Sequence, residues 1–188
     1  MMKEKWIWAA NDSVEKDSYA EFIGKFNTKS NEKEVSLLIA CDSVYTVEIN
    51  GELAAFGGCA DYPHRKMYDT VDVTKYCKGE NDIKITVWYF GMGSSTYKTG
   101  ERGLAFKLRQ GDDVLLCSSE EILSRKNINY KNGYCKLITT QMGISYLYDN
   151  TVENTLPYEK SVLSGFLKGH SVSGQGGAWK GQVIAYSR

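Results

Sequence analysis

The chain has 188 residues, of which 42% are hydrophobic and 24% charged, so it is long enough to bury one sizeable core. Its 23 basic and 23 acidic residues balance, which leaves no net field to draw the chain onto a polyanion, and we expect no nucleic-acid partner. No apolar run approaches the ~20 residues that a membrane helix needs. The N-terminus also lacks the apolar core and cleavage site of a signal peptide. We therefore expect a single cytoplasmic domain with no membrane contact.

The first half of the chain predicts antiparallel strands. Residues 17–26 alternate as a half-buried strand does, and 35–40 are apolar enough for a central strand. A second alternating stretch, 44–49, runs into Asn50-Gly51, the dipeptide that accepts positive φ at both centres of a type I′ turn. The chain then returns through 53–56. This pattern predicts a β-hairpin.

Two long glycine-containing loops interrupt the strands that follow. Residues 57–67 have no periodicity, and 91–103 are rich in glycine, so both are expected to be loops of the kind that carries binding groups. Between them, Asp72 is placed to cap a single helical turn, and 83–90 alternate as a core strand. A further hairpin is predicted over 104–117.

The pattern is weaker beyond residue 118. Residues 120–125 fit either a turn of helix or an edge strand, and 133–139 and 144–148 fit short strands. We expect 1–160 to form one β-sandwich, and 161–188, rich in glycine and serine, to be an extension or the start of a linker to a missing domain. Many short strands joined by turns predict an all-β sandwich of two antiparallel sheets.

Four pieces of the sequence, in a fixed order, resemble one known family. They are WIWA at 6–9, CDSVYTVEINGE at 41–52, YDTVDVTKY at 68–76 and GENDI at 79–83. Together they resemble the galactose-binding-like jelly roll that forms the N-terminal β-sandwich of bacterial α-L-rhamnosidases and related glycoside hydrolases. In those enzymes the hydrolytic carboxylates lie on a separate (α/α) barrel. The resemblance therefore implies a non-catalytic accessory module, which supports the catalytic domain of the same or a companion glycoside hydrolase.

The residues themselves predict no catalytic group, cofactor or metal. Glycoside hydrolysis needs two carboxyl groups about 5 to 9.5 Å apart. Asp61, Asp69 and Asp72 are close in sequence, but the last two are typical of turn and cap positions. His64 and His170 are the only histidines, and neither has a cysteine or histidine at metal-ligand spacing. An autonomous glycosidase or lyase that uses the loop carboxylates remains the alternative.

The cysteines likewise predict no metal site. The cysteines are five in number and spread evenly, without a C-x-x-C pair, which argues against a zinc ribbon and against a complete disulfide framework. We expect reduced, mostly buried thiols at Cys41, Cys59, Cys77, Cys117 and Cys135.

Aromatic and charged residues in the two loops predict a binding surface. Tyr62 and Tyr97 lie where nothing in the pattern requires them in the core, with Asp61, Arg65 and Arg102 near them in the sequence. They fit a sugar site for a rhamnose- or galactose-containing glycan, with a ring beneath the C–H face and charged groups on the hydroxyls. They also fit a contact with a catalytic domain, and we favour this role over the sugar site. A third alternative is a contact with a protein partner, in a module without sugar affinity. Three tryptophans, Trp6, Trp8 and Trp88, are expected to pack against protein and not to stack on a ligand.

Overall fold

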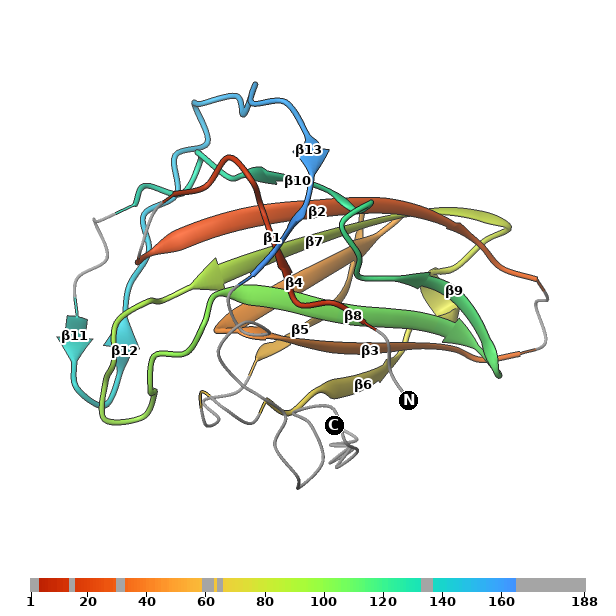
Figure 1. Ribbon diagram of the computed structural model, residues 1–188, viewed down its shortest axis with the longest axis horizontal. Coiled ribbons are helices and arrows are strands. Elements are labelled where there is room, and N and C mark those ends of the chain that lie inside the picture. The colour runs from red at the N-terminus through yellow and green to blue at the C-terminus, as the bar shows by residue number, and fades with distance from the viewer. Residues whose placement is uncertain are drawn as a thin grey trace.

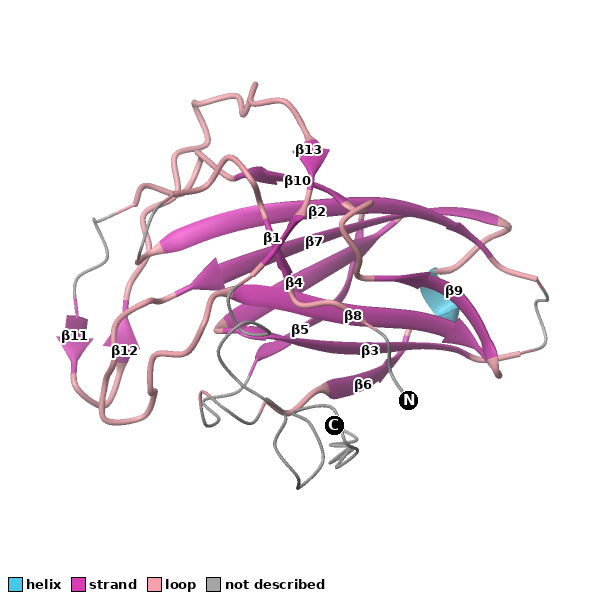
Figure 2. Cartoon of the chain, in the orientation of Figure 1, coloured by secondary structure: helices cyan, strands magenta, loops and turns pink. Residues whose placement is uncertain are grey.

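A computed structural model shows a chain built almost entirely from strands and loops (Figure 2). It describes residues 4–13, 16–29, 33–58, 63, 66–132 and 137–164. One short 3-10 turn, η1 (Thr74–Tyr76), lies within this part. No helix among the described residues is long and apolar enough to cross a membrane.

Two antiparallel sheets stack face to face, as Figure 1 shows. Sheet A has the strand order β14 (Val162–Leu163), β1 (Ile7–Trp8), β8 (Gly103–Gln110), β3 (Val35–Asp42) and β6 (Asp69–Asp72), with β9 (Asp113–Cys117) also paired to β8. Sheet B has the order β13 (Glu159–Lys160), β10 (Leu123–Lys126), β2 (Ser18–Asn27), β7 (Glu80–Tyr89), β4 (Val44–Ile49) and β5 (Glu52–Gly58). A separate hairpin consists of β11 (Leu137–Thr139) and β12 (Gly143–Ile144). The predicted sandwich of antiparallel sheets is confirmed.

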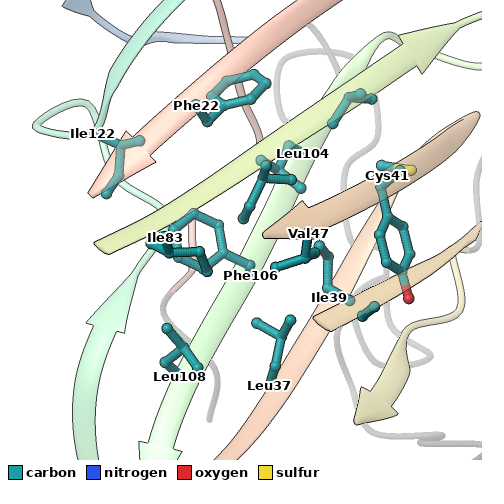
Figure 3. Close-up of a cluster of buried hydrophobic side chains, with 14 of the residues drawn as sticks. Phe22, Leu37, Ile39, Cys41, Val47, Ile83, Leu104, Phe106, Leu108 and Ile122 are labelled. Atoms are coloured by element: carbon teal, nitrogen blue, oxygen red, sulfur yellow. The ribbon is translucent and has the colours of Figure 1, made fainter. Parts of the chain in front are cut away.

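The main core lies between the two sheets (Figure 3). Ile83, Ile85 and Val87 of β7 point inward, as predicted, and meet Phe106 and Leu108 of β8. Trp6 and Trp8 are also fully buried, as predicted. Burial of these large apolar side chains is the main favourable contribution to folding.

The turn between β4 and β5 is the one that its dipeptide predicts. Asn50 has φ of 53° and Gly51 has φ of 80°, so both central residues are left-handed. The side chain of Asn50 is also used, because its amide nitrogen donates to the carbonyl of Tyr76 at 2.9 Å. The turn thus fixes the hairpin register that places Tyr45, Val47 and Ile49 in the core.

The later elements differ in detail from the prediction. Residues 123–126 form a strand, β10, which lies between β2 and the two-residue β13. The predicted strand over 144–148 is shorter, because β12 ends at Ile144 and only Tyr148 makes a further isolated bridge. Of the predicted C-terminal extension, 165–188 lie outside the described residues, whereas β14 pairs with β1. The domain boundary stays a prediction.

A buried carboxylate holds the segment after β10 on the outer face of sheet B. Glu21 of β2 accepts hydrogen bonds from Arg125 Nε at 2.8 Å, Asn127 Nδ2 at 2.9 Å and Tyr158 OH at 3.1 Å. The Arg125 guanidinium also lies 4.2 Å from the centre of the Tyr158 ring. Because a buried carboxylate needs such partners, this network fixes the base from which the β11–β12 hairpin extends.

Candidate functional site

A cavity of about 210 Å³ lies at one end of the sandwich. In Figure 1 the β11–β12 hairpin and the loop that follows β7 come together at this end. The start of β4 and the end of β5 complete its wall. The lining residues are Ser43, Val44, Gly58, Phe90, Met92, Gly93, Ser94, Thr96, Tyr97, Met142, Gly143 and Ile144.

The end of β7 leads into the cavity wall. Its odd-numbered residues face the core, so Trp88 and Phe90 lie on the outer face of sheet B, beside Val44 of the neighbouring strand. Gly91, with φ of 65°, then turns the chain into the loop 91–102. Ser95 N donates to the Thr140 carbonyl at 3.1 Å and joins this loop to the β11–β12 hairpin.

A buried ion pair supports the cavity wall from behind. Lys66 Nζ lies 2.6 Å from Asp42 Oδ2, and both side chains are 0% exposed. The other carboxylate oxygen accepts hydrogen bonds from the hydroxyls of Tyr97 and Ser43, the latter at 2.9 Å, and both of these residues line the cavity. Because an unpaired buried charge is costly, Asp42 fixes the positions of all three partners.

Gly100 allows the loop to approach this ion pair closely. A Cβ atom at this position would overlap Asp42 Oδ2, so only glycine fits. The carbonyl of Gly100 also accepts a hydrogen bond from Tyr89 OH at 2.9 Å. The loop 91–102 is therefore tied to the core at two points.

The two tyrosines of this network stay neutral at physiological pH. Burial, followed by the negative charge of Asp42, raises the pKa of Tyr97 well above its usual value. The same two causes raise the pKa of Tyr89 to about 12. Both phenols thus act as hydrogen-bond donors and not as bases.

The cavity is lined by both polar and apolar residues. Its lining includes the hydroxyl-bearing residues Ser94 and Thr96 and the apolar residues Phe90 and Met142. The lining residues that the structure describes include no carboxylate. Pockets for drug-sized ligands are roughly 300–1,000 Å³, so this one suits a single small ring with both polar and apolar faces.

Two of the five predicted sugar-site residues fall within the described part of the chain. Tyr97 lines the cavity, but it is only 5% exposed and its ring packs edge-on against Phe90 at a centroid distance of 5.2 Å. Arg102 is half-buried, and its carbonyl accepts a hydrogen bond from Trp6 Nε1 at 3.1 Å. Asp61, Tyr62 and Arg65 lie outside the described residues, so the predicted set stays a proposal.

The remaining candidates for chemistry have structural partners. Asp69 Oδ2 accepts a hydrogen bond from Tyr45 OH at 2.5 Å. Asp72 accepts from Thr74 N at 2.9 Å in a turn just before η1, but the N-cap of η1 is Val73 and not the predicted Asp72, because the helical turn begins one residue later. His64 and His170 lie outside the described residues. Within the described ranges no cluster of three or more histidine, cysteine or acidic side chains could hold a metal ion.

Sequence reasoning missed the apolar part of the cavity. Phe90 continues the outward-facing side of β7 that Trp88 begins, and this alternation is the signal that indicates its position. Met142 and Ile144 carry no comparable signal, because Met142 lies in a turn, Ile144 lies in a strand of two residues, and the place of this hairpin depends on contacts with a distant loop.

Comparison with solved structures shows where this fold occurs. The chain superposes on the GH78-family rhamnosidase of Bacillus sp. GL1 with a TM-score of 0.74 and 19% identity, over 86% of this chain and 18% of that enzyme. It has the fold of an α-L-rhamnosidase domain. The α-L-rhamnosidase of Dictyoglomus thermophilum also superposes, with a TM-score of 0.56 and 19% identity, over 86% of this chain and 21% of that enzyme. The α-L-rhamnosidase of Streptomyces avermitilis complexed with L-rhamnose superposes with a TM-score of 0.52 and 14% identity, over 85% of this chain and 14% of that enzyme.

The match confirms the resemblance to rhamnosidases at the level of fold. The chain spans about a fifth or less of the length of these enzymes, as expected for one domain of such a protein. No protein-family model matches the sequence, and no curated protein matches it either.

Proposed function

We propose that this chain is a non-catalytic accessory module of an α-L-rhamnosidase-type glycoside hydrolase, which supports a catalytic domain and binds carbohydrate. The observation that carries the proposal is the superposition on the Bacillus enzyme, which covers 86% of this chain but 18% of the enzyme. Among the described residues the thiols of Cys77 and Cys117 are free, which is compatible with a cytoplasmic setting that we also propose.

Immunoprecipitation tests the accessory role. An antibody against this domain should recover, from the cells that make it, a polypeptide that hydrolyses an aryl α-L-rhamnoside, because the catalytic domain is expected in the same or a bound chain. The purified 188-residue chain should show no turnover at equal concentration. Turnover by the purified chain would instead support an autonomous glycosidase, and an inactive precipitate would favour a protein-interaction module.

The cavity gives the carbohydrate-binding part of the proposal a test of its own. Gly93 lines the cavity, its φ is not left-handed, and a Cβ there would lie 3.6 Å from its nearest neighbour. Gly93→Leu should therefore fold and fill the cavity. We expect calorimetric titration with L-rhamnose to show about tenfold weaker binding or more, the scale of ~1.4 kcal/mol.

Gly79→Leu is the matched control. Gly79 has open space around its Cβ position, its φ is not left-handed, and it lies in the turn before β7 rather than in the cavity lining. Its substitution should leave the titration unchanged. If Gly93→Leu folds and binds L-rhamnose as the unsubstituted chain does, the ligand does not use this cavity, and the sequence-predicted residues Asp61, Tyr62 and Arg65 become the next positions to substitute.

A further inference from the structure

A row of aromatic side chains continues from the cavity along the outer face of sheet B. The aromatic row consists of six rings, each in contact with the next. Their order is Tyr97, Phe90, Trp88, Tyr19, Tyr130 and Tyr148, with ring-centroid distances between successive rings of 5.2, 4.7, 5.2, 4.2 and 4.8 Å. Tyr146 lies beside the row, 5.9 Å from both Trp88 and Tyr130.

Two of these rings are open to solvent, and the others hold them in place. Tyr146 is 63% exposed and Tyr148 is 49% exposed, whereas Tyr19 is fully buried beneath them. Trp88, Tyr19 and Tyr130 form a nearly parallel stack, with interplanar angles of 14° and 5°. The exposed rings are thus oriented before any ligand arrives, which lowers the entropy that binding would cost.

The exposed rings follow directly from the cavity wall in the sequence. Met142 and Ile144 line the cavity, and Tyr146 and Tyr148 come two and four residues after Ile144. At no more than about 3.3 Å per residue, the chain from Ile144 to Tyr148 can span up to about 13 Å, enough for more than one sugar ring. The two tyrosines therefore extend the same surface beyond the cavity.

We propose that the cavity and the two exposed tyrosines form one extended site for an oligosaccharide. The terminal sugar occupies the cavity, and the following residues lie against Tyr146 and Tyr148. This inference rests on the proposed carbohydrate binding and adds the length of the ligand to it.

The chemistry of the surface around Tyr146 and Tyr148 favours a glycan over a protein. Tyrosine rings offer flat faces to the C–H groups of a sugar, and their hydroxyls bond to its oxygens. Next to Tyr148, Asp149 Oδ2 lies 3.4 Å from Lys131 Nζ, and this pair is about one-third exposed and supplies further polar groups. Leu147, between the two tyrosines, is also exposed but offers no ring to a sugar.

A series of ligands of increasing length tests the inference. We would titrate the chain with L-rhamnose and with di-, tri- and tetrasaccharides that end in α-L-rhamnose. Affinity should rise by about tenfold from the monosaccharide to the tetrasaccharide, since each stacked ring contributes about 0.5–1.5 kcal/mol. Tyr146→Ala and Tyr148→Ala should remove most of this rise while binding of L-rhamnose itself stays unchanged.

Two substitutions in the same segment are the controls. Tyr146→Phe keeps the ring and should retain most of the length dependence, and Leu147→Ala should retain all of it. A rise with length that survives in both alanine variants would overturn the inference. So would an unchanged affinity along the series for the unsubstituted chain, although L-rhamnose binding would then still support the proposed function.

Light scattering tests whether this surface makes a protein contact instead. If this surface joins two copies of the chain, the protein should self-associate, and Leu147→Ala and Tyr146→Ala should both restore the monomer, because such a contact would use the exposed apolar side chains. That result would overturn the inference in favour of a protein contact. A monomeric chain whose affinity depends on glycan length supports it.

Discussion

Replacing Lys66 with methionine should lower the free energy of unfolding by about 3–5 kcal/mol, because it leaves the carboxylate of Asp42 buried without its cation. The two side chains are fully buried and their charged atoms lie 2.6 Å apart. Methionine fills a similar volume, so the loss is one of charge pairing and not of packing. Urea denaturation followed by tryptophan fluorescence gives the measurement.

A surface ion pair provides the matched comparison. Lys84 Nζ lies 2.9 Å from Glu48 Oε2, but both side chains are more than one-third exposed, so Lys84→Met should cost less than about 1 kcal/mol. Adding Asp42→Asn to Lys66→Met should recover part of the stability, because it removes the uncompensated charge. Equal costs for the two lysine substitutions would contradict the role assigned to Asp42.

Phe106→Ala should cost about 3–5 kcal/mol through the cavity that it leaves in the core. Phe106 is 1% exposed and lies between the two sheets, among Ile39, Val47 and Leu104 (Figure 3). The same substitution at Phe56, which is 67% exposed on the edge strand β5, should change stability by less than about 0.5 kcal/mol.

Urea midpoints for the two phenylalanine variants decide this prediction. The denaturant slope should stay constant, so that a lower midpoint reports stability alone. A small loss at Phe106 would mean that the sheets do not pack on one another as described. A large loss at Phe56 would mean that β5 is covered in solution.

Local patterns predict the strands that border the core. Val47 and Ile49 alternate with polar residues up to Asn50-Gly51, and Ile85 and Val87 do the same in β7. In each case one side chain in two is buried, so the period of the sequence and the period of burial are the same. The resemblance to rhamnosidases then supplied the arrangement of the sheets, which the superposition confirms.

The site could be predicted only in part, because its contacts join distant residues. Tyr97 lies in a polar loop whose pattern gives no reason to bury it. It is buried because its hydroxyl reaches Asp42, 55 residues away, and its ring meets Phe90. The β11–β12 hairpin is similar, since Thr140 meets Ser95 across 45 residues. Such pairings are set by tertiary packing, and no local periodicity reports them.

The size of the natural polypeptide that carries this domain tests the central claim most directly. We would recover it from its source cells with an antibody against the domain and measure its mass on a denaturing gel. An accessory module of a rhamnosidase-type enzyme predicts a band several times larger than the 21.1 kDa of this chain. A band at 21.1 kDa, with no glycosidase bound to it, would contradict the account and leave a free-standing binding protein.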